Sequence, residues 1–264
     1  AGLSSSAALE IATALALDTA FNLWLNPVEM AQLCRDVENR YAGVSCGLLD
    51  QFASRLGRTG HALFIDCRSL EARHVPMDFD DHRLIIVDSG IRRELADSAY
   101  NQRRSECEEA VVLIRETNAS VTSLRDMTFQ LLAEHENLLP PDLFARCRHV
   151  VSENYRVLAA CESLAAGDVP AFGQLMNASH FSLRNDFEVS HPAVDKLVEE
   201  ALQVDGVLGA RLTGAGFGGC TVNLVVERAL PDFERKMRPL VDDWSTQSMV
   251  VGTSKQARVT EVIA

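Results

Sequence analysis

The sequence is short of lysine, of paired cysteines and of long apolar runs, and each shortage excludes a class of protein. Only Lys196, Lys236 and Lys255 among its 25 basic residues are lysines, and no Walker A sequence is present, so phosphate binding cannot depend on a P-loop lysine. The seven cysteines are odd in number and include no Cys-x-x-Cys pair. That pattern favours a reducing cytoplasm over a disulfide framework or a zinc site. The longest apolar stretches, such as 84–87, fall far short of the roughly 20 residues that a membrane span requires.

Histidine spacing and net charge argue against two further classes. The seven histidines show no His-x-x-x-His or similar spacing, so we expect no zinc enzyme. A formal net charge of −12 argues against a broad nucleic-acid surface. The composition, 47% hydrophobic and 23% charged, is typical of a globular chain with a substantial core. We therefore expect small-molecule partners, with neither nucleic acid nor membrane among them.

The order of helical and strand-like patterns predicts an α+β chain of 264 residues in two units. A helix is expected from about residue 5 to 21, and because it is apolar on nearly every face we expect it to be buried. A second helix is marked by Asn26 as N-cap, Pro27 at the first position and Glu29 in a capping box. Further helices are expected at 46–56, 97–166, 169–183, 192–203 and 232–244, and strands at 61–67, 84–88, 209–212, 220–227, 247–251 and 257–262. The late strands after a helical middle suggest a second α+β unit, with a boundary near residue 95.

The segment 2–7, with three consecutive serines, leads directly into the first helix. A glycine and hydroxyl residues at a helix N-terminus leave backbone N–H groups unpaired, and the helix dipole adds positive potential that attracts an anion such as phosphate. Plain N-capping by serine is the simpler interpretation of these residues taken alone. Three serines nevertheless exceed what one cap requires.

The glycine-rich segment 214–219 satisfies the Gly-x-Gly-x-x-Gly pattern. A dinucleotide site needs a helix after these glycines, whereas the following residues, 220–226, are strand-like, so that interpretation fails. Two interpretations stay open: a tightly packed turn between strands, or a backbone surface close to a ligand.

Two carboxylates occur within apolar patterns. Glu38 lies between Val37 and Tyr41 at the end of the capped helix, and Asp50 lies between Leu49 and Phe52. A cap or a partly exposed ion pair is the common explanation for such an acid. The functional alternative is a metal ligand or a catalytic base in a partly desolvated site.

Four segments, in the right order along nearly the whole chain, resemble the galactokinases of the GHMP small-molecule kinase superfamily. Residues 2–10 resemble the superfamily's phosphate-binding motif, 46–52 resemble the segment with the catalytic aspartate, and 60–69 and 212–220 resemble galactokinase signatures. The resemblance implies an α+β GHMP-kinase fold of two domains with the active site between them. A partial α/β domain for ATP binding and catalysis would cover 1–95, and a ferredoxin-like C-terminal domain would cover 96–264.

The resemblance also implies the residues that bind ATP and magnesium. The backbone from Ala1 through Gly2, Leu3, Ser4 and Ser5 to Ser6 would cradle the phosphates of ATP. Ser6 and Glu38 would hold Mg²⁺, a hard cation that takes few protein oxygens and shares those of the phosphates. Gly214 and Gly216, with the rest of their loop, would lie close to the nucleotide.

For the sugar, the resemblance implies three contacts and a reaction. Asp50 would meet the C1 hydroxyl of galactose as base or orienting acceptor, and the Gly47 backbone and the Tyr100 phenol would contact the sugar. The γ-phosphoryl group of ATP would pass to the anomeric hydroxyl, giving galactose 1-phosphate, with catalysis mainly by positioning and charge stabilisation.

The galactokinase segment with a Glu-His-x-Asp cluster and an arginine is not found in this sequence, which opens inside the serine motif. We therefore expect a fragment that lacks part of its sheet, and its activity and its sugar stay open. Kinases for N-acetylgalactosamine or arabinose are alternatives, as is a sensor that binds galactose and ATP without turnover. The intact serines and Asp50 argue against the sensor.

Overall fold

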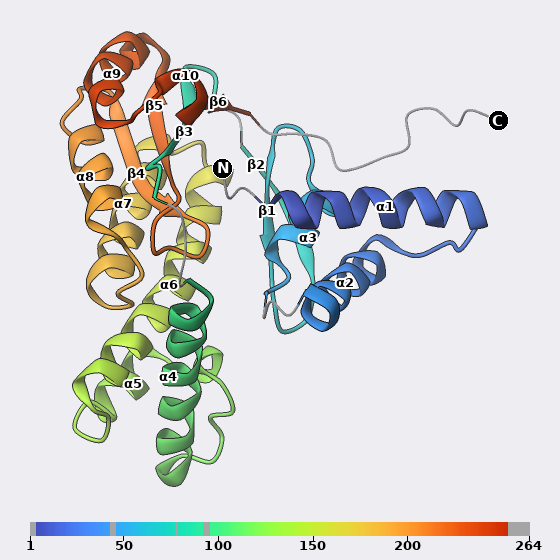
Figure 1. Cartoon of the computed structure of the whole chain (residues 1–264). Helices are drawn as coiled ribbons and strands as arrows, with labels where there is room; N and C mark the ends of the chain where they lie inside the picture. Colours follow the sequence, from blue (N-terminus) through green and yellow to red (C-terminus); the bar gives the residue numbers. More distant parts are fainter. Residues whose placement is uncertain (1–3, 43–45, 78, 92–95, 253–264) are drawn as a thin grey trace. The chain divides into compact units, whose positions relative to one another are not determined.

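The computed structural model describes residues 4–42, 46–77, 79–91 and 96–252, which divide into two compact units (Figure 1). The N-terminal unit lies within 2–78 and the C-terminal unit within 79–251. The division precedes β3 (His82–Asp88) because this strand pairs with strands from the end of the chain. The sequence patterns predict this strand in the first unit, because they put the boundary near residue 95. The assignment of domains to 1–95 and 96–264 stays a prediction.

The N-terminal unit contains α1 (Ser5–Phe21), α2 (Pro27–Val37), a π-helical turn (Glu38–Ala42), α3 (Leu49–Leu56) and the antiparallel strands β1 (His61–Ile65) and β2 (Ala72–Pro76). Its core is formed by the fully buried side chains of Ile11, Met30 and Phe52, one from each of the three α-helices. The capping box of α2 is confirmed: the side chain of Asn26 accepts from the Val28 and Glu29 N–H groups, and Glu29 accepts from the Asn26 N–H. The strand β2 was not predicted.

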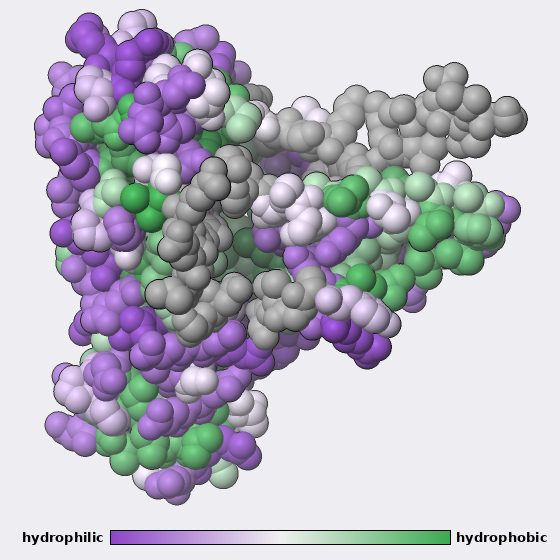
Figure 2. All heavy atoms as spheres, in the orientation of Figure 1, coloured by the Kyte–Doolittle hydropathy of each residue, from purple (hydrophilic) through white to green (hydrophobic). Residues whose placement is uncertain are grey.

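The prediction that α1 is buried on nearly every face is wrong for the described structure. Ala7 and Ile11 are buried, whereas Leu9 and Phe21 remain about two-thirds exposed, at 70% and 68%. Apolar side chains consequently form part of the surface of this unit (Figure 2). An apolar pattern shows which side chains favour burial, but it does not supply the element that covers them.

The C-terminal unit is built on an antiparallel sheet with the strand order β4-β5-β3-β6. Its remaining strands are β4 (Val207–Thr213), β5 (Cys220–Val226) and β6 (Ser248–Val251). One face packs against α8 (Pro192–Ala201) and α9 (Leu230–Met237) through a core that includes Ala210, Val225 and Phe233. The predicted strand at 257–262 lies outside the described residues.

Two glycines let a helix approach the sheet closely. On α7 (Val169–Asn185), a Cβ atom at Gly173 would lie 2.5 Å from the carbonyl oxygen of Leu208, and one at Gly209 would lie 2.6 Å from the carbonyl oxygen of Gly173. Backbone therefore meets backbone between α7 and β4, a contact that any side chain at either position would prevent. The helix α6 (Pro141–Ala165) lies beside α7.

The helical stretch predicted at 97–166 is interrupted. It contains α4 (Ala96–Thr117), a 3₁₀ turn (Leu124–Asp126), α5 (Phe129–Glu134) and α6, which share a core with Ile114 and Val151 at its centre. The helix predicted at 232–244 is likewise interrupted: α9 ends at Met237 and is followed by a 3₁₀ helix (Arg238–Leu240) and by α10 (Trp244–Gln247). A 3₁₀ turn (Glu227–Ala229) precedes α9. Within the described ranges, no helix combines the length and apolarity needed to cross a membrane.

Candidate active site

The pair assigned to magnesium meets in the N-terminal unit. Ser6, in the first turn of α1, donates a hydrogen bond of 2.8 Å from Oγ to Oε1 of Glu38, which is 32 residues away in the sequence. Glu38 begins the π-helical turn that ends α2, and its side chain is almost buried. Such single π turns are frequent at functional sites. The structure therefore brings together the two residues that the sequence resemblance paired as magnesium ligands.

Two further residues surround the second oxygen of Glu38. The buried Gln51 amide donates to Oε2 at 2.7 Å, and the Cys46 thiol donates to the same oxygen at 3.2 Å. Burial and the hydrogen bond to Glu38 raise the pKa of Cys46 to about 11, so this group is a neutral thiol near pH 7. Sequence reasoning missed Gln51. The sequence feature that could have indicated its role is its position next to Asp50. Neighbouring residues of a helix point to different sides, so Gln51 and Asp50 lie on different sides of α3.

The cluster around Glu38 is rich in negative charge. Gln51 also donates to Oε2 of Glu10 at 3.4 Å, and burial, with the charge of Glu38 nearby, raises the pKa of Glu10 against the opposing effect of that hydrogen bond. In the part of the chain that the structure describes, no arginine, lysine or histidine forms an ion pair with either carboxylate. The negative charge here has no counter-ion among the described residues.

The donor set fits a magnesium ion that is shared with a nucleotide. Ser6 and Glu38 supply hard oxygen atoms, and the Oε1 atom of Gln51 is buried beside them without a hydrogen-bond partner among the described residues. The described residues contain no cluster of three or more His, Cys, Asp or Glu side chains suited to a metal. A site with so few protein ligands suits a cation that keeps waters and phosphate oxygens.

The start of α1 differs from a plain serine cap. Ser4 occupies the N-cap position with φ 57° and ψ 41°, in the left-handed region, and its side chain forms no capping hydrogen bond. The N–H groups of the first turn are therefore left without a side-chain cap from Ser4, as an anion-binding helix end requires. Ala1, Gly2 and Leu3 lie outside the described residues.

The residues assigned to the sugar are exposed, and they are divided between the two units. Asp50 lies in the first turn of α3, and Gly47 lies just before this helix in open space. Among the described residues, no hydrogen bond or ion pair engages the Asp50 carboxylate, so the expected desolvation is not seen in this unit. Tyr100 lies on α4 in the other unit, with 37% of its surface exposed.

The glycine loop joins β4 to β5 as a tightly packed turn. Gly214 and Gly216 have φ of 83° and 86°, which glycine adopts without strain. A Cβ atom at Gly216 would lie 2.2 Å from the Val189 carbonyl oxygen, which also accepts a 2.6 Å hydrogen bond from the Phe217 N–H. The strand that follows confirms that this is no dinucleotide fingerprint. The contact of Gly214 and Gly216 with a nucleotide stays a prediction.

The α+β fold is that of a class of small-molecule kinases, and the chain belongs to the GHMP kinase family. Residues 1–58 match the GHMP kinases N terminal domain, and residues 160–238 match the GHMP kinases C terminal domain. Within this family, its relatives include galactokinases. The galactokinase of Chloroflexus aurantiacus is 47% identical over 252 residues, covering 91% of this chain and 64% of the relative. That of Clostridium beijerinckii is 41% identical over 238 residues, covering 90% and 61%.

Solved structures agree with this placement. The chain matches Lactococcus lactis galactokinase complexed with galactose with a TM-score of 0.90 and 36% identity, over 97% of this chain and 66% of that one. The mevalonate kinase of L. major, at 21% identity and a TM-score of 0.60, shares the fold over 96% of this chain and 67% of its own. The chain spans less than two thirds of the length of the curated galactokinases that it matches.

Proposed function

We propose that the protein to which this chain belongs transfers the γ-phosphoryl group of ATP to the C1 hydroxyl of galactose, giving α-D-galactose 1-phosphate and ADP. The observation that carries the proposal is the match over 97% of the chain to a galactokinase solved with galactose. The Ser6–Glu38 contact supports it from the geometry, because it forms an oxygen site at the helix end where phosphates are expected.

The nucleotide would be held at the start of α1. The first-turn N–H groups, with the backbone of 1–6, would donate to the phosphate oxygens, and Gly214 and Gly216 would lie close to the nucleotide. Ser6 and Glu38 would hold Mg²⁺, which supplies positive charge to the transferring phosphoryl group when bound. Gln51 would fix the orientation of the Glu38 carboxylate through its 2.7 Å hydrogen bond.

The sugar would be oriented by Asp50. As an exposed carboxylate in the first turn of α3, it is compatible with the positive end of the helix dipole and can accept the proton of the C1 hydroxyl or orient that group. Gly47 would contact the sugar through its backbone, and Tyr100 through its phenol. Since the chemistry of such transfers is mainly positioning, small changes at Asp50 affect turnover strongly.

Two alternatives keep the same fold. A kinase for a related sugar, N-acetylgalactosamine or arabinose, would share every residue assigned above. A sensor that binds galactose and ATP without turnover could also share them. The presence of Ser6, Glu38 and Asp50 argues against a sensor, because a protein without turnover could lose them. A role in galactose metabolism and a location in the cytoplasm belong to the same proposal, the latter supported by the odd, scattered cysteines of the sequence.

The test is ADP release from ATP and Mg²⁺ in the complete protein, with galactose and with competing sugars, beside Asp50→Asn. We expect galactose-dependent ADP formation that falls about a thousandfold or more in the variant, while the unfolding transition stays in place. Near-normal turnover of Asp50→Asn would remove Asp50 from the mechanism. Binding of ATP and galactose without ADP would favour the sensor, and ADP with another sugar alone would change the substrate.

A further inference from the structure

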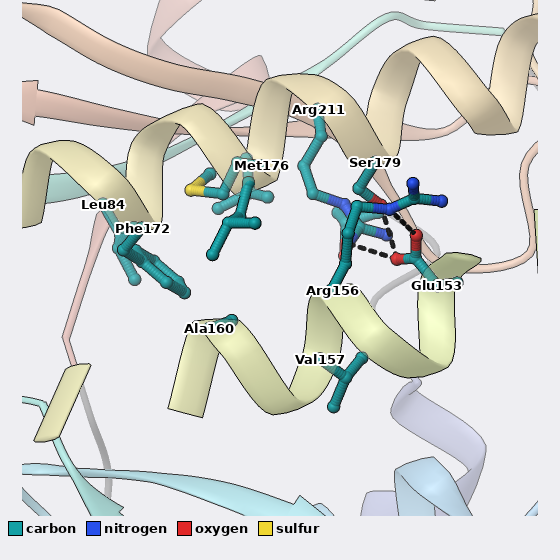
Figure 3. Close-up of a pocket in the computed structure, with 12 residues that line it drawn as sticks. Leu84, Glu153, Arg156, Val157, Ala160, Phe172, Met176, Ser179 and Arg211 are labelled. Carbon is teal, nitrogen blue, oxygen red and sulfur yellow. Dashed lines mark hydrogen bonds and ion pairs between the residues drawn. The ribbon is translucent and has the colours of Figure 1, made fainter. Parts of the chain in front are cut away.

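The C-terminal unit contains a pocket of about 330 Å³ between α6, α7 and one face of the sheet (Figure 3). None of its lining residues has a role in the proposed phosphoryl transfer. Its volume falls within the range of about 300–1,000 Å³ that small-molecule sites occupy. The lining separates into a charged end and an apolar end.

The charged end is organised around Glu153 of α6. Its carboxylate accepts hydrogen bonds of 2.5 Å from the Ser179 hydroxyl and 2.6 Å from Nε of Arg156, and it pairs with Nη1 of Arg211 at 3.5 Å (Figure 3). Ser179 is 2% exposed. These contacts come from α6, α7 and β4, so three elements fix the positions of the two guanidinium groups.

The charges at this end do not balance. Of the residues that the structure describes, two guanidinium groups face one carboxylate, which leaves one positive charge in a partly enclosed site. Burial lowers the pKa of the neighbouring His149 to about 4, so this ring adds no charge near pH 7. Although burial acts to raise the pKa of Glu153, the hydrogen bond from Ser179 and the charge of Arg211 outweigh it and hold that pKa low.

Both guanidinium groups keep donors for a ligand. Arg211 donates from Nε to the Leu212 carbonyl at 3.0 Å, and Arg156 donates from Nη2 to the Ser152 hydroxyl at 2.8 Å. Within the described ranges, Nη2 of Arg211 and Nη1 of Arg156 form no hydrogen bond to protein. A guanidinium group with unused donors is suited to a carboxylate or phosphate, to which it can donate two parallel hydrogen bonds.

The other end of the pocket is apolar. Figure 3 shows Leu84 and Phe172 away from the arginines, with Met176 between the two ends. An ion pair that served only to join α6 to the sheet would need neither an unbalanced charge nor an open apolar cavity beside it. The arrangement is that of a site for a molecule with one anionic end and one apolar end.

We propose that this pocket binds a small organic anion, with its carboxylate or phosphate group at Arg156 and Arg211 and its hydrocarbon part against Phe172 and Met176. The hydrocarbon part is recognised by burial of apolar surface, and the anionic group by charge-assisted hydrogen bonds. This proposal does not depend on the proposed kinase activity, because its test measures binding without turnover.

The probe is the methyl group of Met176 in the full chain labelled with ¹³C at its six methionine methyls. Hexanoate and hexyl phosphate represent the two anionic groups, and hexanol is the uncharged control. We expect both anions to shift the Met176 signal, assigned by its loss in Met176→Leu, with a dissociation constant at least about tenfold lower than that of hexanol. A shift with only one of the anions would identify the group that the site recognises.

Arg156→Gln and Arg211→Gln should each weaken anion binding about tenfold or more and leave hexanol binding unchanged. Arg235→Gln is the matched control, because Arg235 lies on α9 in an exposed pair with Asp232 outside the pocket. The signals of Met237 and Met127 report whether each variant is folded. If Arg211→Gln does not fold, Arg156→Gln decides the test. An unmoved Met176 signal with both anions, equal binding of hexanol, or normal anion binding by a folded Arg156→Gln would overturn the proposal.

Discussion

Glu38 and Glu153 are two largely buried glutamates that each accept a serine hydroxyl, from Ser6 and Ser179, yet their charge surroundings are opposite. Glu38 is bound by neutral donors, Gln51 and Cys46, and lies near a second carboxylate. Glu153 is bound by two arginines. Among the described residues, the first cluster carries an excess of negative charge, which favours a cation, whereas the second carries an excess of positive charge, which favours an anion.

This difference shows that burial of an acid does not by itself identify its role. A buried charge is stabilised only if it is paired or coordinates a metal. The sign of the charge left over by the protein side chains therefore indicates the class of ligand. On this basis the Glu38 cluster suits Mg²⁺ with a nucleotide, and the Glu153 cluster suits an organic anion.

The largest expected effect separates the two glutamates by activity. In the complete protein, Glu38→Gln should lower galactose-dependent ADP formation about hundredfold or more, because the neutral amide attracts Mg²⁺ far less than the carboxylate does. Glu153→Gln, which changes the same atoms in the other cluster, should leave the rate within about twofold. Equal losses in the two variants, measured at saturating ATP and galactose, would contradict the comparison.

The pH dependence of stability should have opposite signs in the two units. In the C-terminal unit, burial lowers the pKa of His149 from 6.5 to about 4, so the unfolded chain binds more protons between these values. The stability of this unit should therefore fall from pH 6.5 towards pH 4, by up to about 3 kcal/mol from this residue, and further as Glu153 becomes protonated. In the N-terminal unit, the pKa of Glu10 is higher in the folded chain than in the unfolded chain. The stability of this unit should therefore fall as the pH rises from 4.5 through the raised pKa of Glu10.

Urea unfolding across this pH range, followed separately in each unit by amide exchange, checks the two signs. His149→Gln should flatten the acid slope of the C-terminal unit, while His82→Gln on β3 serves as the control in the same unit. An unchanged slope in His149→Gln would show that another group is responsible.

The two glutamates should also differ in their effect on folding. Glu153→Gln removes two charge-assisted contacts and leaves Arg211 and Arg156 unbalanced, so it should lower the free energy of unfolding by about 2 kcal/mol. Glu38→Gln removes a charge that has no counter-ion in the part of the chain that the structure describes, and should leave stability unchanged or raise it. Urea titrations of both variants in the absence of Mg²⁺ measure the difference, and a larger loss in Glu38→Gln would contradict this account.

The smallest effect concerns Gln51 as a positioning residue. Gln51→Met nearly preserves volume but removes the 2.7 Å hydrogen bond to Glu38, so the Mg²⁺ concentration for half-maximal activity should rise about fivefold with little change in kcat. A structural role alone would lower stability and leave that Mg²⁺ dependence as it was. The Mg²⁺ concentration for half-maximal activity of Gln51→Asn, which retains the amide, should lie between those of the unaltered protein and Gln51→Met.

Local features of the fold were predictable from the sequence, whereas long-range contacts were not. The capping box of α2 and the glycine turn between β4 and β5 depend on a few neighbouring residues, and both are observed. The exposure of α1 was not foreseen, because an apolar pattern does not show what covers it.

The site was predictable only in part. The pairing of Ser6 with Glu38 came from family resemblance, since nothing in the intervening residues specifies it. Gln51 was missed because its role depends on α3 lying beside the end of α2. Glu153 and Arg211 were missed for the same reason: a helix and a strand distant in sequence bring them together.

The most direct test of the central claim is the Mg²⁺ dependence of galactose-dependent ADP release in the complete protein, Glu38→Gln and Glu153→Gln. The unbalanced charge at Glu38 predicts that the Mg²⁺ concentration for half-maximal activity rises at least about tenfold in Glu38→Gln and stays unchanged in Glu153→Gln. The same Mg²⁺ dependence in all three proteins would contradict the assignment of the cation to Ser6 and Glu38.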